Sequence, residues 1–315
     1  MHGPFPFFQK DRRPVSSGTL GALVQLQRQD LLTGLVEVLY PGEAQTLLFF
    51  NLGTPLVMYV QSEGNWRKVP ASQWSDAFAQ PNGEASVIPL GGDSLRTCLM
   101  ALESGQGESE EILLRPPGFA AHLAQVKARE TASLLRVRDE AFHGLLVVPG
   151  GMVDVQDVLI FSSSGIQTDA KTLTRLIGEE DRLMRVTQIE FPQFPPFMQE
   201  YALRVAFIAL AEPAMKRFEQ LAGDTLMELL GQEVNKYAYH QGWRIQFFGA
   251  HVAHRQFFQD AGEAMVVYRS LFRAIRQYVN RVVGASLAAS VVNEGVNKLP
   301  NVYRDVFNQR YFLAG

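Results

Sequence analysis

GLVEVLYPGEAQTLLFFNLGTPLVMYV, residues 34–60 of the chain, predicts three short β-strands that follow one another as a meander. Two turns, Pro41-Gly42 and Leu52-Gly53, separate runs of β-branched, aromatic and other apolar residues. The middle run, residues 46–50, is apolar almost throughout, so we expect a strand that is buried on both faces. The meander is therefore expected to be a structural element and not a functional site.

A second stretch, GLLVVPGGMVDVQDVLIFSSSGIQTD at residues 144–169, repeats this pattern with few identities. The offsets between matched positions stay between 108 and 112 residues. A repeat unit of this length indicates a duplicated domain and not a solenoid. The matched positions are Gly34 with Gly144, Pro41-Gly42 with Pro149-Gly150, Phe50 with Phe161, and Gly53 with Gly165.

The residues around the meander predict the other elements of the first copy. Ser17-Gly18-Thr19 offers caps for a helix with leucines at helical spacing, and Pro70 opens a short helix. A strand over 85–90 and a helix capped by Asp93-Ser94 follow. In the second copy the corresponding predictions are a helix within 123–137, a helix over 169–179 and a strand over 184–191.

Glycines and apolar residues accompany this order of elements at Leu23, Thr33-Gly34, Val36, Leu48, Phe50, Gly53, Ser94-Leu95 and Leu99-Met100. Together they resemble the PATAN domain of certain bacterial response regulators and gliding-motility proteins, over about residues 17–104. The family often has a polar or acidic residue before the glycine of the second turn, where this chain has Asn51-Leu52. The resemblance implies tandem PATAN-like modules that bind other proteins in two-component, motility or polarity systems.

The predicted fold class is α+β, with two tandem small α/β modules that contain antiparallel strand meanders, followed by an all-α domain. A stiff, proline-rich linker at 191–196 precedes a helix over 197–220 that is apolar on most faces. The clearest helix of the last domain covers 261–283. The predicted boundaries are an N-terminal arm at 1–16, modules at 17–110 and 111–212, and a helical domain at 213–315.

Length and composition indicate a folded protein of two or three domains, because the 315 residues are 47% hydrophobic and 19% charged. No apolar stretch approaches the ~20 residues of a membrane span, and the first residues lack a signal-peptide pattern. We therefore expect a cytoplasmic protein without membrane insertion. The single cysteine, Cys98, excludes an intrachain disulfide and lies among leucines at helical spacing, so we expect a buried, inert thiol.

Charge is unevenly distributed along the chain. From Pro213 onward there are 12 Lys and Arg residues against 8 Asp and Glu residues, whereas the preceding part is acidic. Arg269, Arg273 and Arg276 form an i, i+4, i+7 row opposite the apolar face of the helix at 261–283. Such a row is most often a solvated face, and it is otherwise suited to the acidic surface of a protein partner. Nucleic acid or phospholipid is the least favoured partner for this row, because the chain is not basic overall and has no reader motif.

The sequence has few arrangements suited to catalysis or to metal binding. His251 and His254 are three residues apart and could face one way, with His240, Asp260 or Glu263 nearby in sequence, but no metal-site spacing is present. The chain has no GxxxxGK[ST], GxGxxG or GxSxG motif. We therefore expect no catalytic residue, no cofactor and no bound metal.

The resemblance to the PATAN domain, with the lack of catalytic motifs, implies a non-enzymatic bacterial signalling or scaffold protein that acts through protein–protein interaction. The partner would be a signalling or motility protein, and the C-terminal helices could also associate with a second copy of the chain. Two alternatives remain. One is an enzyme of unrecognised type with its site among the histidines of the helical domain, and the other is nucleic acid binding by that domain.

Overall fold

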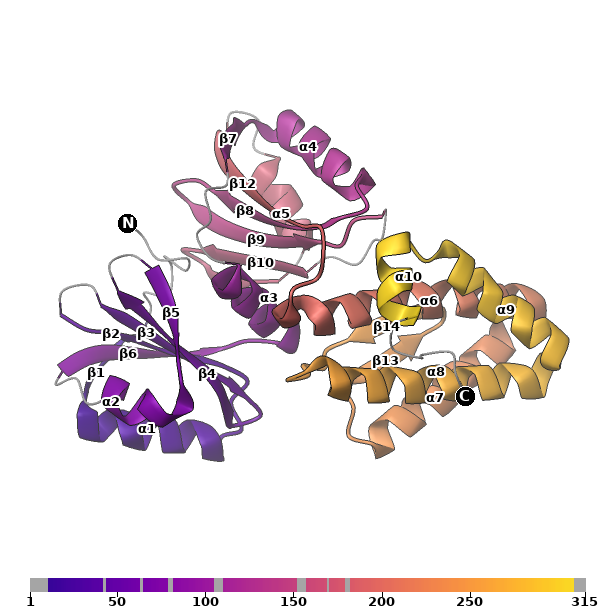
Figure 1. The fold of residues 1–315 in the computed structure, drawn as a ribbon, viewed down its shortest axis with the longest axis horizontal. Helices are drawn as coiled ribbons and strands as arrows, with labels where there is room; N and C mark the ends of the chain where they lie inside the picture. Colours follow the sequence, from indigo (N-terminus) through magenta and orange to yellow (C-terminus); the bar gives the residue numbers. More distant parts are fainter. Residues whose placement is uncertain are drawn as a thin grey trace. The chain divides into compact units, whose positions relative to one another are not determined.

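The computed structural model describes residues 11–41, 44–62, 65–78, 82–104, 110–151, 157–168, 170–178 and 182–308 (Figure 1). Antiparallel sheets in the N-terminal part and helices in the C-terminal half confirm the predicted α+β class. Tertiary contacts divide the chain into two compact units. The first unit comprises Met1–Leu123, Ser133–Val147 and Gln156–Glu190, and the second comprises Ala124–Ala132, Val148–Val155 and Phe191–Gly315.

The first sheet contains the predicted meander. Its strands lie in the order β1-β6-β2-β3-β4-β5, and all neighbouring pairs are antiparallel. Arg13–Ser16, which were expected in the N-terminal arm, form β1 at one edge, and the other edge, β5, was not predicted. The strands are β1 (Arg13–Ser16), β2 (Gly34–Leu39), β3 (Gln45–Asn51), β4 (Thr54–Ser62), β5 (Asn65–Val69) and β6 (Asn82–Pro89).

Both faces of the first sheet are covered, as its apolar central strand predicted. In β3, Leu47, Leu48, Phe49 and Phe50 are all buried. The helix α1 (Ser17–Gln29) packs its Leu20 into the cluster on one face. A short 3₁₀ turn (Ala71–Gln73) leads into α2 (Trp74–Phe78), and α3 (Gly92–Glu103) follows β6.

The helix α3 is buried on nearly all sides, which is unusual for a helix of a small module. It contacts β2 of the first sheet and also β10 of the second sheet (Figure 1). Cys98 lies at its centre and is fully buried, and burial raises the pKa of its thiol, as expected for an inert residue. The helix begins at N-cap Gly91, and the predicted cap Asp93 lies instead in the first turn.

The second sheet has the order β7-β12-β8-β9-β10-β11, which matches that of the first sheet strand for strand. A helix again follows the first strand, and a short helix again precedes the last one. The two sheets are therefore copies of one topology. The elements are β7 (Glu111–Leu114), α4 (Pro116–Ala128), β8 (Ala132–Arg138), β9 (Phe142–Val148), β10 (Asp157–Ser162), β11 (Gly165–Gln167), α5 (Ala170–Ile177) and β12 (Met184–Phe191).

The predicted register of the repeat is wrong by one strand. Gly144 lies in β9, which takes the place of β3, whereas the sequence pattern matched it with Gly34 at the start of β2. Both β7 and β8 begin 98 residues after β1 and β2, respectively, instead of about 110. The predicted helix within 123–137 is also wrong in its second half, where β8 begins at Ala132. The error arose because every strand–turn–strand segment of a meander has the same local pattern.

Two glycines mark the equivalent turns of the two copies. Gly53 follows β3 with φ +77°, and a Cβ there would lie 2.5 Å from the carbonyl oxygen of Arg28 in α1. Gly150 follows β9 with φ +76°, and a Cβ there would lie 2.8 Å from the carbonyl oxygen of Arg129, just after α4. Each glycine therefore allows the turn to approach the end of the preceding helix closely.

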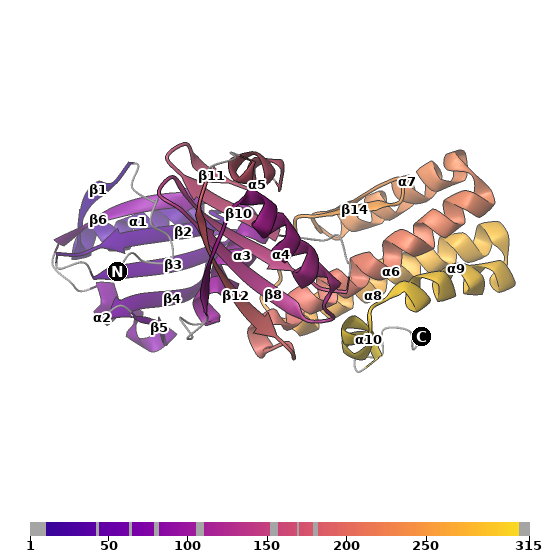
Figure 2. The same cartoon turned by 90° about the horizontal axis from the view of Figure 1, so that it is seen from above.

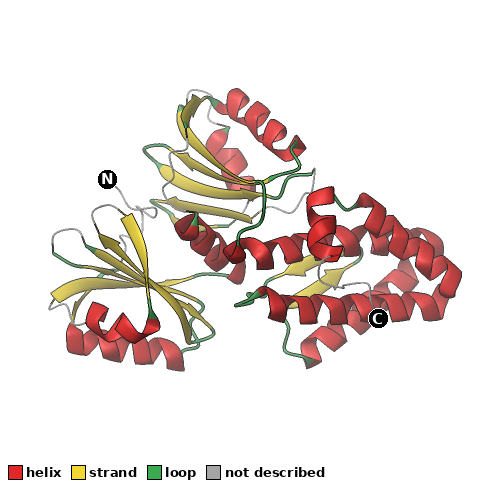
Figure 3. Cartoon of the chain, viewed as in Figure 1, coloured by secondary structure: helices red, strands yellow, loops and turns green. Residues whose placement is uncertain are grey.

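The second unit consists of packed helices and one hairpin. Figure 2 shows the long helices α6, α8 and α9 side by side, and α6 contacts each of the other helices. The hairpin of β13 and β14 lies among them (Figure 3), so this part is not entirely helical. The elements are a 3₁₀ turn (Pro196–Met198), α6 (Gln199–Ala222), α7 (Asp224–His240), β13 (Ile245–Phe248), β14 (His251–His254), α8 (Ala261–Val283), α9 (Ala285–Lys298) and α10 (Asn301–Asn308).

The helix α6 is the centre of this unit. It is buried on most faces, as predicted, and it runs continuously through the boundary predicted between residues 212 and 213. The C-terminal α10 packs on α6, and Tyr303 of α10 donates a hydrogen bond to the carbonyl oxygen of Pro149. Among the described residues, no helix combines the length and the apolar composition needed to cross a membrane.

We expect Gly53→Ala and Gly150→Ala each to destabilise the protein by about 1–3 kcal/mol, because both positions combine positive φ with a close carbonyl oxygen. Gly21→Ala is the matched control. Gly21 lies in α1 with no atom within 4 Å of its added Cβ, so this change should stabilise by up to about 1 kcal/mol. Urea unfolding of the three variants measures the expected loss of stability at the two turn glycines and the expected gain at Gly21. Equal effects at the three sites would contradict the assigned turns.

Glu37 makes the stability of the first sheet depend on pH. The side chain is buried in β2, 3.5 Å from Arg12, and it accepts a hydrogen bond from Gln45. Burial raises the pKa of Glu37 from 4.5 to about 7, although Arg12 and Gln45 oppose this shift. Between these pH values the folded state binds more protons than the unfolded chain, so stability falls as pH rises from about 4.5 to 7.

We expect Glu37→Gln to remove most of this loss, which is roughly 3 kcal/mol for a shift of this size. Urea unfolding of the wild type and the variant at pH 5, 6, 7 and 8 tests this. The stability advantage of the variant should grow with pH up to about 7 and then level off. Stability curves that stay parallel over this range would show that Glu37 titrates normally in the folded state.

Candidate binding groove

The predicted arginine row lies on the helix α8. This helix covers Ala261–Val283, the range expected from the sequence, and Asp260 caps it by accepting a hydrogen bond from the backbone N–H of Glu263 at 2.9 Å. Its apolar face is buried as predicted, at Val267, Leu271, Ile275 and Tyr278. This packing fixes which residues of α8 remain available on the opposite face.

The structure separates the three arginines of the row. Arg269 is half-buried, whereas Arg273 and Arg276 are exposed. Within the part of the chain that the structure describes, neither Arg273 nor Arg276 forms a hydrogen bond or an ion pair. These two guanidinium groups are therefore available to an external anion, and each keeps all its N–H donors.

A groove of about 310 Å³ lies between α7 and α8, and Arg273 lines it. Arg269 and Arg276 lie outside the lining, so the groove and the row share one residue. Its other polar lining residues are Glu233 and Tyr237 from α7, and Ser270, Gln277 and Arg281 from α8. The charged groups among these lining residues are the guanidinium groups of Arg273 and Arg281 and the carboxylate of Glu233, so the net charge of the lining is +1.

Arg281 is held in the groove by two contacts. Its Nη2 donates to Oε2 of Glu233 at 2.8 Å, and its guanidinium carbon lies 5.0 Å from the ring centroid of Tyr278. Both charged side chains are well exposed, at 64% for Arg281 and 59% for Glu233. An ion pair with this exposure contributes at most about 1 kcal/mol, so it can exchange with an incoming carboxylate at little cost.

Aromatic side chains supply the apolar part of the groove. Tyr237 is 37% exposed and packs edge-to-face on Trp243, with ring centroids 5.6 Å apart. Tyr278 is nearly buried under Arg281. The groove thus combines cations with ring surfaces, a combination that binds acidic side chains together with their aliphatic stems.

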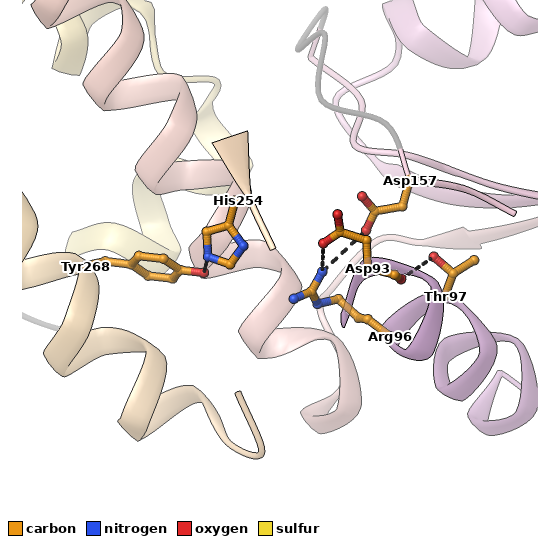
Figure 4. Close-up of polar contacts among 6 residues, drawn as sticks. All are labelled: Asp93, Arg96, Thr97, Asp157, His254 and Tyr268. Atoms are coloured by element: carbon orange, nitrogen blue, oxygen red, sulfur yellow. Dashed lines mark hydrogen bonds and ion pairs between the residues drawn. The ribbon is translucent and has the colours of Figure 1, made fainter. Parts of the chain in front are cut away.

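The two histidines that are three residues apart in sequence do not come together in the structure. His251 and His254 lie in β14 and not in a helix, so the three-residue spacing turns them to opposite faces. The His251 side chain is 86% exposed, with Nδ1 3.6 Å from Glu212. His254 is buried, and its Nε2 lies 2.8 Å from the hydroxyl oxygen of Tyr268 (Figure 4). No group of three or more His, Cys, Asp or Glu side chains in the described residues could hold a metal ion.

His143 is also buried. It lies in β9 with its ring 6.3 Å from that of Phe161. Burial, together with the charges of Arg136 and Arg138, lowers the pKa of His143 to about 4. The imidazole is therefore neutral at pH 7 and packs as part of the second sheet.

Buried charges that the sequence did not indicate tie α3 to the second sheet. Arg96 is almost fully buried, and its Nη1 lies 3.1 Å from Asp93 and 3.6 Å from Asp157 of β10 (Figure 4). Arg136 of β8 donates to the carbonyl oxygen of Ala101 at 2.8 Å, near the C-terminus of α3. These contacts hold α3 against the strands of the second sheet.

The sequence missed the half of the groove that α7 contributes. Glu233 and Tyr237 have no local signal, because their position beside α8 depends on tertiary packing. Arg281 offers a weaker signal. It is a further basic residue of α8, but it follows Arg276 by five residues and so lies about 140° around the helix from it. Comparisons with known proteins add no further information, because no family model, curated protein or solved structure matches the chain.

Proposed function

We propose that the chain is a non-enzymatic interaction protein that binds an acidic surface of a protein partner through α8. The observation that supports this most directly is the exposure of Arg273 and Arg276, without internal counter-ions in the described residues. Guanidinium groups pair with carboxylates in bidentate geometry, which favours recognition of acidic protein surfaces.

The charge distribution of the sequence supports the same proposal. From Pro213 onward, basic residues exceed acidic ones by four, although the whole chain has a formal charge of −3. A basic face on a chain that is acidic overall increases the rate of encounter with an acidic partner and weakens non-specific attraction to nucleic acid.

The tandem sheets suggest the biological setting of this interaction. Residues 17–104 resemble the PATAN domain, and this resemblance implies a signalling or scaffold protein in a bacterial two-component, motility or polarity system. In this proposal the two sheets serve as a cytoplasmic scaffold, and the helices provide the surface that selects the partner. The partner would then be a protein of the same pathway.

The double variant Arg273→Glu/Arg276→Glu tests the proposal. We expect at least a tenfold loss of partner recovery when the tagged full-length chain is used for capture from host-cell lysate, because two attractive charges become repulsive. Arg269 is left unchanged because it is half-buried. Quantitative mass spectrometry of captured proteins is the measurement, and circular dichroism and thermal unfolding verify that the variant is folded.

Lys216→Glu/Arg255→Glu provides a control with the same change of charge, because both residues are exposed and neither lines the groove. This control should retain the partners that the wild type captures, since the effect is assigned to α8 and not to net charge. If the folded α8 variant captures the same proteins at wild-type yield, the α8 surface is not the binding site. If both double variants lose the same partners, net charge explains the interaction.

A further inference from the structure

The groove between α7 and α8 already contains one acidic side chain bound to an arginine. Glu233 reaches across from α7 and accepts a hydrogen bond from Arg281 of α8 at 2.8 Å. Arg273, which has no partner in the described residues, lines the same groove. The lining thus shows how a carboxylate binds here, and it also has the donors for a second one.

The dimensions and composition of the groove restrict what it can bind. A volume of about 310 Å³ is at the lower limit of ligand-binding clefts, so the groove fits one or two side chains and not a large cofactor. The net positive charge selects an anion. The exposed ring of Tyr237 and the amide of Gln277 favour a glutamate side chain, whose aliphatic stem can pack while its carboxylate accepts hydrogen bonds.

We propose that this groove binds a glutamate-containing segment of a protein partner, and that Glu233 competes with that segment for Arg281. The partner's carboxylate binds Arg273, and a second carboxylate or the same one replaces Glu233 at Arg281. Glu233 therefore weakens binding and favours partners with more than one acidic residue. This inference rests on the proposed function, because it assumes that the arginine face of α8 is the binding surface.

The competition predicts opposite effects of two neutralising changes in one groove. Glu233→Gln removes the internal competitor and should strengthen binding of an acidic segment by about twofold to fivefold, the usual size of an exposed ion pair. Arg273→Gln removes a charged donor and should weaken binding by about fivefold or more. Both residues are exposed, so both variants should fold like the wild type.

The test uses the full-length chain and a fluorescein-labelled hexaglutamate peptide as the probe, with fluorescence polarisation at about 50 mM salt. Glu228→Gln is the matched control, because Glu228 is exposed on the same helix but does not line the groove. We expect the wild type and Glu228→Gln to bind with similar affinity, Glu233→Gln to bind more tightly, and Arg273→Gln to bind more weakly. A labelled hexaglutamine peptide should not bind.

Three results would overturn the inference. The first is the absence of hexaglutamate binding, and the second is an equal gain in affinity from Glu233→Gln and Glu228→Gln, which would reflect net charge alone. The third is a loss of affinity in Arg276→Gln without any effect of Arg273→Gln or Glu233→Gln. In that case the arginine row binds acidic partners outside the groove, so the proposed function stands and the groove assignment falls. If no arginine variant changes binding, both are wrong.

Discussion

The first unit depends on the burial of α3, on nearly all sides, between strands of two sheets. A helix that is buried on nearly every side has no face that water could stabilise, so both sheets must be present to satisfy it. Arg96 strengthens this requirement, because a buried guanidinium group needs counter-charges and finds them in Asp93 and in Asp157 of β10. The two copies of the repeat are therefore joined by packing and by charge, and the linker between them is not their only connection.

Local patterns predicted most of the secondary structure. The bounds of α8 and β12 agree with the ranges expected from periodicity, and the buried central strand β3 was correctly identified. Features that depend on contacts between distant parts of the chain were not predicted correctly. The register of the repeat slipped by one strand because a meander offers equivalent strand–turn–strand segments, and only sheet order shows that Gly150, and not Gly165, corresponds to Gly53.

In the candidate site, too, local spacing predicted some residues, and tertiary packing decided the rest. Helical spacing identified Arg273 and Arg276 as exposed residues of one face, because i, i+4 and i+7 positions align whatever the tertiary structure. The groove itself could not be predicted, since Glu233 and Tyr237 come from α7 and their proximity to α8 follows from packing on α6. The same limit explains the histidines. A three-residue spacing aligns side chains in a helix, but His251 and His254 lie in a strand.

The place of α3 also has a consequence for how the chain folds during synthesis. Its last residue, Glu103, is made before any of β10, whose final residue is Ser162. At a ribosomal rate of about 5–20 residues per second, synthesis from the end of α3 to the end of β10 takes roughly 3–12 s. Over this time the side of α3 that packs on β10 has no partner strand. During that interval the nascent chain exposes the apolar surface of α3 together with Arg96, which is buried only in the folded protein. A charged residue in that surface keeps it soluble and less open to incorrect association until β10 and Asp157 emerge.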